Sequence, residues 1–286
     1  MSAPEPLSPL LVAEAITAAL KEDLGRAGDI TSAATIPADA KATAELVARK
    51  PGTIAGLDLA AAAFHALDPS VRFERSAADG DAVAAKTVLA RVSGPGRAVL
   101  SAERVALNYA CHLSGVATAT AAFVERVKHT KARIADTRKT TPGMRAFEKY
   151  AVRCGGGMNH RFGLDDAILI KDNHIAVAGG VIAAIRGARA VAGHLVKVEI
   201  EVDNLDQLVE AMVEPPDAVL LDNMKPDMLR EAVQLVAGRA ITEASGNVTL
   251  ETVGGIAETG VDMISTGWIT HSAPILDLAL DVVVER

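Results

Sequence analysis

The hydrophobic and polar positions of the first hundred residues predict one helix followed by short strands. Ser8 can cap this helix, Pro9 suits its first turn, and Gly25 suits its end. The strand-like runs that follow are separated by turn residues. They are KATAELVARK (41–50), VRFER (71–75) and TVLARVSG (87–94), with a helix-like stretch LDLAAAAFHAL (57–67) among them. The pattern indicates strands covered by a helix, an α/β sandwich.

A long helical pattern begins near Ser101. We expect it to be interrupted near Ser114 and Gly115, because glycine weakens a helix interior. We place the change of domain there, with a first domain over residues 1–112 and a second over residues 113–275.

Beyond Lys131, strand-like and helix-like segments alternate regularly. This alternation predicts parallel strands joined by helical crossovers. The predicted strands are RIADT (133–137), AILIK (167–171), VKVEIEV (196–202), AVLLD (218–222), AITEA (240–244) and VDMIST (261–266).

Polar residues stand at the ends of these strands. They are Asp136, Arg138, Lys171, Glu201, Asp222, Ser245-Gly246 and Thr266-Gly267. In an α/β barrel the carboxyl ends of all strands surround the active site, whereas an open doubly wound sheet binds its ligand at one switch point. Polar ends on consecutive strands therefore favour a barrel. Six or seven strands are fewer than eight, so we expect the barrel to be incomplete.

Composition narrows the class of protein. Half of the 286 residues are hydrophobic, which is enough for a packed core, and the formal net charge of −7 disfavours nucleic-acid binding. Two cysteines are too few for a disulfide scaffold. The first residues lack the pattern of a secretory signal, and no uncharged apolar run reaches the ~20 residues of a membrane span. We therefore expect a cytoplasmic protein.

The segment DTRKTTPG (136–143) is a candidate anion site. Thr141 can cap a helix whose first turn holds Pro142, and the amino end of that helix would face the same space as Arg138 and Lys139. The alternative is a surface loop with two solvated cations.

A second cationic segment is GGGMNHRFGLDDAILIKDNH (155–174). Its glycines permit a close backbone approach to a ligand, and His160, Arg161 and Lys171 follow. Residues 136–174 hold 7 Lys and Arg against 5 Asp and Glu, a net charge of +2 in an acidic chain. A cationic pocket suits a small polyanion that guanidinium groups can grip. The alternative for His160 is a structural histidine.

Carboxylates lie on one face of the strand VKVEIEV. Glu199 and Glu201 share a face with Lys197, and the next strand ends at Asp222. Glu201 and Asp222 could hold Mg²⁺, in part through water, together with a diphosphate. The alternative is a buried ion network in which Glu199 and Glu201 pair with lysines, and we expect Glu199 to be the more structural of the two.

Two glycine loops follow the last two strands, EASGN (243–247) and STGW (265–268). Each can form a backbone nest for a phosphate, and the last two strands of α/β barrels commonly carry such a site. Cations for a polyanion, carboxylates for a metal and a separate phosphate cradle together fit phosphoribosyl pyrophosphate.

These residues resemble the quinolinate phosphoribosyltransferase family, also called carboxylating nicotinate-nucleotide pyrophosphorylases. The similarity covers most of the chain and is most specific from Asp136 to Ile175. Its segments are GDITSAATI, SAERVALNYACHLSGVAT, ADTRKTTPGMRAFEKYAV, GGGMNHRFGLDDAILIKDNHI, VEIEVDN, LLDNM, EASGN and TGVDMISTGWITHSAP.

The resemblance implies a fold and a reaction. The fold is an N-terminal α/β open-faced sandwich plus a C-terminal incomplete α/β barrel, like a type II phosphoribosyltransferase, with a tail at 276–286 that packs back on the first domain. The reaction converts quinolinate and phosphoribosyl pyrophosphate into nicotinate mononucleotide, pyrophosphate and CO₂, in NAD biosynthesis. The family's enzymes are Mg²⁺-dependent homodimers.

The resemblance also implies roles for single residues. Quinolinate would be held by Arg138, His160, Arg161 and Lys171, and the 5′-phosphate by Ser245, Gly246, Asn247 and Gly267, with Thr137 and Thr266 beside these groups. Catalysis would depend on Lys139, Lys171, Glu201 and Asp222, and Arg104 would complete the partner subunit's site. Many relatives carry glycine where this chain has Asn247, so the nest is better supported than that side chain.

Two alternatives remain open at this point. A Schiff-base aldolase would use Lys171 as its nucleophile, but it would not explain the phosphate loops. A non-catalytic or altered-specificity relative would bind a pyridine or a phosphorylated ligand, and the presence of Lys139, Glu201 and Asp222 disfavours lost catalysis.

Overall fold

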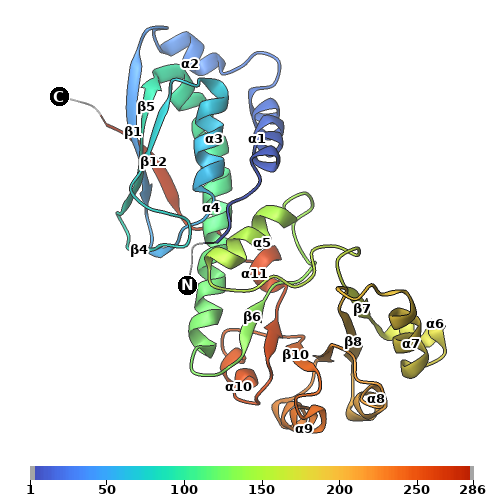
Figure 1. Cartoon of the computed structure of the whole chain (residues 1–286). Helices are drawn as coiled ribbons and strands as arrows, with labels where there is room; N and C mark the ends of the chain where they lie inside the picture. The colour runs from blue at the N-terminus through green and yellow to red at the C-terminus, as the bar shows by residue number, and fades with distance from the viewer. Residues whose placement is uncertain (1–3, 284–286) are drawn as a thin grey trace. The chain divides into compact units, whose positions relative to one another are not determined.

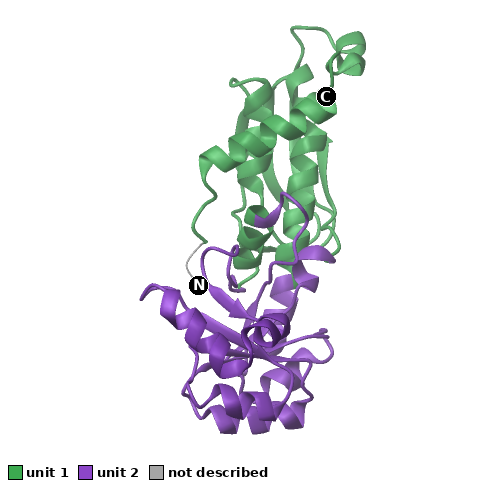
Figure 2. Ribbon diagram, turned by 90° about the vertical axis from the view of Figure 1, so that its right-hand side faces the viewer, with its two compact units in different colours: residues 1–119, 146–156, 273–286 green, residues 120–145, 157–272 purple. Residues whose placement is uncertain are grey.

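The structure is a computed structural model that describes residues 4–283. The chain forms two compact units, shown in Figure 2. Unit 1 contains residues 1–119, 146–156 and 273–286, and unit 2 contains residues 120–145 and 157–272. The ends of the predicted first domain and tail, residues 1–3 and 284–286, lie outside the described residues.

Unit 1 is built on an antiparallel sheet with the strand order β12-β1-β5-β3 (Figure 1). Its strands are β1 (Lys41–Ala48), β3 (Arg72–Arg75), β5 (Val88–Pro95) and β12 (Leu278–Val282). The C-terminal strand β12 pairs with β1, with Leu280 opposite Leu46. A short second ladder joins β2 (Gly52–Thr53) to β4 (Ala82–Val83). All three strands predicted for this region are therefore present.

Helices cover this sheet because their apolar sides need burial. The helices are α1 (Pro9–Leu24), α2 (Ile30–Thr35) and α3 (Leu57–Leu67). The alanine-rich α3 packs against α1 and β3, and the rings of Phe64 and Phe73 lie 5.9 Å apart. The carboxylate of Asp79 accepts hydrogen bonds from the first amides of α3, at 2.9 Å from Gly56 and 3.1 Å from Leu57. The predicted helix-covered sheet is confirmed.

Helix α4 (Gly96–Val127) corrects the prediction of a break near Ser114 and Gly115, because it runs without interruption through both residues. The Ser114 hydroxyl accepts a hydrogen bond from the Ala55 amide at 3.0 Å and donates one to the Ala55 carbonyl at 3.1 Å. A Cβ at Gly115 would lie 2.3 Å from the Pro274 carbonyl oxygen. The Ser-Gly pair therefore permits close packing on the helix surface.

Unit 2 contains a parallel sheet of six strands in the order β6-β11-β10-β9-β8-β7. The strands are β6 (Arg133–Ala135), β7 (Ile168–Ile170), β8 (Val198–Val202), β9 (Ala218–Asp222), β10 (Ile241–Ser245) and β11 (Met263–Ser265). The end strands β6 and β7 are not paired with each other among the described residues. The sheet is therefore an unclosed barrel of six strands, as predicted.

Helices stand around the outside of this sheet, as Figure 1 shows. Helix α7 packs on β8, α8 on β8, α9 on β10 and α10 on β11. The helices assigned wholly to unit 2 are α6 (Asp172–Ala178), α7 (Val181–Val191), α8 (Leu205–Ala211), α9 (Pro226–Val236), α10 (Val253–Ala257) and α11 (Trp268–His271), and α5 (Arg145–Cys154) precedes them. The outer faces of the strands are thereby buried, as in an α/β barrel.

Two predicted helix starts are wrong. Helix α5 begins at Arg145 and not at Pro142, because Gly143 has a φ of +78° and cannot continue a right-handed helix. The helix-like stretch TLETVGGIAETG (249–260) predicts a helix from Thr249, whereas α10 begins at Val253. Thr249 and Thr252 instead close a turn in which the Thr249 amide donates to the Thr252 hydroxyl at 2.9 Å. The loops that precede both helices are thus longer than expected.

Within the described residues, no single helix is both long and apolar enough to cross a membrane. Helices α6 and α7 have the length and composition of a membrane span only when they are taken together, and the pair is bent by 92° at its break.

Candidate active site

The carboxyl ends of the unit 2 strands surround a cavity of about 370 Å³. Parallel strands bring their carboxyl ends to the same edge of the sheet, which is why residues distant in sequence meet there. The lining residues are Thr137, Arg138, Lys139, His160, Arg161, Leu169, Lys171, Glu201, Leu220, Asp222, Glu243, Ser245 and Ser265.

Nine of the residues singled out in the sequence line this one cavity. They are Thr137, Arg138, Lys139, His160, Arg161, Lys171, Glu201, Asp222 and Ser245. The structure does not place Gly246, Asn247, Thr266 or Gly267 in its lining, although the first two continue the loop after Ser245. Arg104 lies exposed on α4, in unit 1.

The cavity is strongly cationic on one side. Arg138 Nε is buried and has no hydrogen-bond partner among the described residues. Burial and then the charge of Arg138 lower the pKa of Arg161, whose Nη1 donates to the Ala167 carbonyl at 3.1 Å. Two guanidinium groups that line one cavity, one of them with a buried donor that has no described partner, form a site for an anion.

An ion pair lies beside these arginines. Lys171 Nζ donates to Glu201 Oε2, joining the end of β7 to β8. An ammonium held by a carboxylate does not suit the neutral amine that a Schiff-base aldolase needs. The predicted ion network is thus present for Glu201, whereas Lys197 pairs instead with Asp217 at 2.6 Å.

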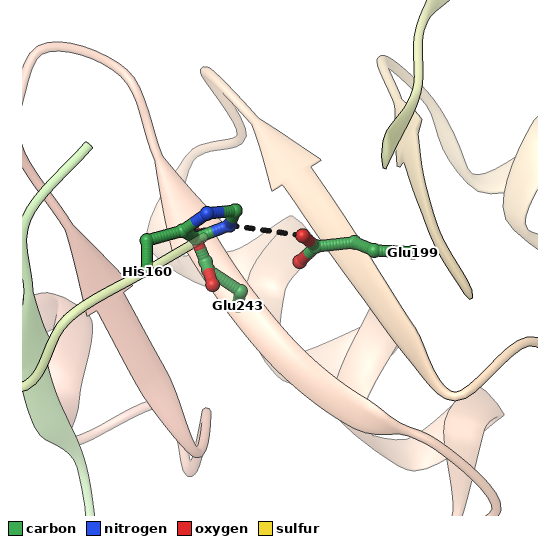
Figure 3. Close-up of side chains that lie close together, drawn as sticks. All are labelled: His160, Glu199 and Glu243. Carbon is green, nitrogen blue, oxygen red and sulfur yellow. Dashed lines mark hydrogen bonds and ion pairs between the residues drawn. The ribbon is translucent and has the colours of Figure 1, made fainter. Parts of the chain in front are cut away.

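His160 is held by both of its ring nitrogens. The Arg161 amide donates to His160 Nδ1 at 2.8 Å, and Nε2 lies 2.9 Å from Glu199 Oε2 (Figure 3). A backbone N–H can only donate, so Nδ1 accepts in this contact, and Nε2 is directed at the Glu199 carboxylate. Its role in holding quinolinate stays a prediction.

Three side chains at the base of the cavity could by distance hold a metal ion. The ligand atoms of His160, Glu199 and Glu243 lie within 4.8 Å of one another. In the structure, however, His160 Nε2 is engaged with Glu199 Oε2 at 2.9 Å, and metal coordination would have to replace that contact. Glu201 and Asp222, which line the cavity from the adjacent strands β8 and β9, are better placed for a hard cation with oxygen ligands.

The loop after β10 turns through two successive residues with positive φ. Gly246 has a φ of +90° and Asn247 one of +51°, and the predicted phosphate nest in this turn stays a prediction. A Cβ at Gly246 would lie 2.2 Å from Asn223 Oδ1. Asn247 Nδ2 donates to the same oxygen at 2.9 Å, so the Asn247 side chain supports the loop.

The loop after β11 packs against the Arg138-Lys139 segment. A Cβ at Gly267 would lie 3.0 Å from Lys139 Cδ and 3.1 Å from Thr137 Oγ1. The hydroxyl of Thr270 donates to the Lys139 carbonyl at 2.7 Å. Thr266 is buried, and its amide donates to the Ala135 carbonyl at 3.1 Å. In this arrangement Gly267 and Thr266 shape the wall that carries Lys139.

Sequence reasoning missed Glu243, a buried carboxylate in the cavity lining. The strand register places Glu201, Leu220 and Glu243 side by side on β8, β9 and β10. Ser245, which was singled out, lies two residues further along β10 and so on the same face. Counting back two residues from each polar strand end would have found this glutamate.

Comparison with known protein families gives matches over both parts of the chain. Residues 29–114 match the profile of the N-terminal domain of quinolinate phosphoribosyl transferase, and residues 116–281 match that of its C-terminal domain. The chain is 45% identical over 274 residues to the nicotinate-nucleotide pyrophosphorylase [carboxylating] of Mycobacterium leprae, covering 94% of this chain and 96% of that protein. It is 44% identical over 265 residues to the probable nicotinate-nucleotide pyrophosphorylase [carboxylating] of Bacillus subtilis, covering 93% and 91%.

Solved structures agree with these matches. The crystal structure of NadC from Streptococcus pyogenes has a TM-score of 0.93 and 40% identity, covering 98% of this chain and all of that one. The nicotinate-nucleotide pyrophosphorylase structure from Francisella tularensis has a TM-score of 0.94 and 38% identity, covering 97% and 98%.

Proposed function

The chain belongs to the quinolinate phosphoribosyltransferase family, and from this premise we propose that it transfers the phosphoribosyl group of phosphoribosyl pyrophosphate to quinolinate. CO₂ is lost in the reaction, and nicotinate mononucleotide and pyrophosphate are formed. The observation that carries the proposal is one cavity lined by Arg138, Arg161, Lys171, Glu201 and Asp222, which offers cations for a dicarboxylate beside carboxylates for a metal-bound diphosphate.

The cations account for binding of the pyridine dicarboxylate. Arg138 and Arg161 have donors to spare, and guanidinium groups bind carboxylates through two parallel hydrogen bonds. Lys171, held by Glu201, adds a third positive charge on the same side. Binding by these groups would fix the ring so that its nitrogen faces the ribose, and such orientation supplies much of the rate enhancement in transfer reactions.

The chemistry needs charge compensation more than covalent help from the protein. Departure of pyrophosphate leaves a positive charge on the ribosyl carbon, which the carboxylates of Glu201 and Asp222 would stabilise. Lys139 would neutralise phosphate oxygens of the donor. The ring nitrogen then attacks, and the N⁺ that results favours loss of the neighbouring carboxylate as CO₂.

Magnesium is the proposed cofactor. Glu201 and Asp222 would hold it, in part through water, from adjacent strands. Bound Mg²⁺ supplies charge neutralisation for the leaving diphosphate.

A homodimer is part of the proposal, with Arg104 of each subunit completing its partner's site. The support is that Arg104 is exposed on α4 and is not among the residues that line the cavity of its own subunit. The cytoplasmic location expected from the sequence is also proposed, and fractionation of cells that express the tagged chain would test it.

The decisive experiment incubates the purified protein with quinolinate, phosphoribosyl pyrophosphate and Mg²⁺. Nicotinate in place of quinolinate is the control for specificity. We expect nicotinate mononucleotide and CO₂ from quinolinate alone. Binding of quinolinate without any product would instead support a non-catalytic relative.

A further inference from the structure

Glu243 is a carboxylate in an unfavourable place. It lies on β10 in the lining of the anion-binding cavity, and only 5% of its surface is exposed. Its Oε1 has no hydrogen-bond partner among the described residues. A buried carboxylate oxygen without such a partner is costly to keep charged, so the group tends to neutralise by taking up a proton.

The hydrogen bonds of the cluster decide which carboxyl group holds that proton. Figure 3 shows the imidazole of His160 beside Glu243, with Glu199 directed toward the imidazole from β8, two strands away from β10. Glu199 receives the Nε2 proton at 2.9 Å, which stabilises it as a carboxylate. Glu243 Oε1 lies 3.7 Å from the same nitrogen, beyond hydrogen-bond range. Glu243 is therefore the group to be protonated.

The neighbouring carboxylates act in the same direction as burial. The groups that face Glu243 are Glu199 on β8, Asp136 after β6, Ser265 on β11 and His160. Burial and then the negative charge of Glu199 raise the pKa of Glu243 to about 7. The charge of His160 and a hydrogen bond with Ser265 act in the opposite direction and lower this pKa, but they do not outweigh burial and Glu199.

A substrate with two carboxylates strengthens this preference. It would bring two further negative charges into a cavity that Glu243 lines, and like charges at close range disfavour ionisation of the protein group. The cations of the cavity would bind the substrate, and among the described residues the ion pair of Glu243 is with His160 and not with any of them.

We propose that Glu243 takes up a proton when the pyridine dicarboxylate binds and donates this proton to carbon 2 of the ring when CO₂ leaves. The inference rests on the proposed function. In this step the bond between carbon 2 and its carboxylate breaks, and the electron pair stays on carbon 2. The Glu243 O–H bond breaks, a C–H bond forms at carbon 2, and Glu243 is left as a carboxylate that solvent protonates again. Until the carbanion is protonated CO₂ can recombine with it, so a slow donor slows net release of CO₂.

The first arm of the test measures protons on binding. Quinolinate is titrated into the protein at pH 8 in buffers of different ionisation enthalpy, with wild type, Glu243→Gln and the control Glu231→Gln, an exposed glutamate on α9. We expect wild type and the control to take up most of one proton, and Glu243→Gln to take up none. Equal uptake by all three proteins would overturn the assignment.

The second arm compares two products in a single turnover. Release of pyrophosphate reports phosphoribosyl transfer, and release of labelled CO₂ reports decarboxylation. For Glu243→Gln we expect CO₂ release to fall at least tenfold below pyrophosphate release, within the range for loss of a general acid, while the phosphoribosylated dicarboxylate accumulates. Glu231→Gln should release both together, and Glu243→Asp, which keeps an acid, should recover part of the CO₂.

The outcomes are separable. Simultaneous release of both products by Glu243→Gln, or loss of both by a folded variant, overturns the role of Glu243. Absence of both products with wild type contradicts the proposed function instead. If Glu243→Gln does not fold, Glu243→Asp decides the matter, because a wild-type product ratio at wild-type rate would show that the position of the acid is unimportant.

Discussion

At the scale of single residues, Arg138 is the side chain whose hydrogen-bonding capacity the protein itself leaves unused. Its Nε is buried without a described partner in the cavity lining. Leaving such a donor unsatisfied costs about 1–3 kcal/mol, which an anionic ligand would recover. Its place in the fold is thus explained by binding and not by stability.

Arg138→Ala should therefore nearly abolish turnover without unfolding the protein. We expect at least a tenfold loss of kcat/KM for quinolinate, since a bidentate charged contact is lost, and a melting temperature close to that of wild type. Arg145→Ala is a useful comparison, because Arg145 donates to the Phe162 carbonyl at 3.1 Å and belongs to the loop structure. A variant at position 138 with more than a tenth of wild-type activity would contradict the assignment.

Glu243 also predicts a pH dependence of stability. A carboxyl group whose pKa is raised in the folded state, here to about 7 from 4.5, favours folding fully below pH 4.5, and this contribution is lost as pH rises through 7. At about 1.4 kcal/mol per pKa unit, the difference of about 2.5 between these two pKa values corresponds to a full loss on the order of 3–4 kcal/mol. Glu243→Gln cannot ionise at this position. Its unfolding free energy, measured by chemical denaturation, should therefore rise relative to that of wild type between pH 5 and pH 8. A difference in unfolding free energy that stays constant over this range would count against a neutral Glu243.

At the scale of elements, local pattern located the strand ends but not the continuity of helix α4. A Ser-Gly pair in a helical pattern has two meanings, a break or a close contact, and only the position of Pro274 decides between them. The glycine is separated from this residue by more than 150 positions in sequence, so local pattern could not reveal the contact.

Gly115→Ala should destabilise the protein for that reason. The added Cβ would meet a backbone carbonyl oxygen at 2.3 Å, which cannot move as a side chain can. We expect a loss of about 1–3 kcal/mol, the usual cost of overpacking. Gly187→Ala on α7, where no atom lies within 4 Å of the new Cβ, should be neutral or stabilising by up to about 1 kcal/mol. Equal effects of the two substitutions in urea denaturation would refute this account of α4.

The strands and most helices of unit 2 were predictable because the spacing of apolar residues within each segment is enough to identify it. Alternation of apolar positions located all six strands, and the polar residues that end them located five of the cavity's residues, Arg138, Lys171, Glu201, Asp222 and Ser245. The starts of α5 and α10 were not predictable in the same way, because a left-handed glycine and a threonine turn delay them. Glu243 escaped notice because it stands inside a strand, where a carboxylate signals chemistry only once its buried neighbours are known.

At the scale of the whole molecule, the net charge of the chain is opposite in sign to that of its cavity. A net charge of −7 repels anions in bulk, while the cavity gathers Arg138, Arg161, Lys139 and Lys171 at one rim. Binding of a dianion must then depend on close contact and not on long-range attraction. The proposed partner arginine, Arg104, would add one more positive charge to that rim from outside the subunit.

Complementation between two inactive variants tests this shared site. Arg104→Ala should impair the partner's site, whereas Glu201→Gln impairs the site of its own subunit, so a mixed dimer has one doubly altered site and one intact site. Random reassociation makes half of the dimers mixed, and therefore restores about a quarter of the sites. The measurement is activity after the two purified variants are unfolded and refolded together, with each refolded alone as the control. Activity no higher than the mean of the two controls, in a preparation shown to contain mixed dimers, would place Arg104 outside the neighbouring site and leave each subunit's cavity to work with its own cations.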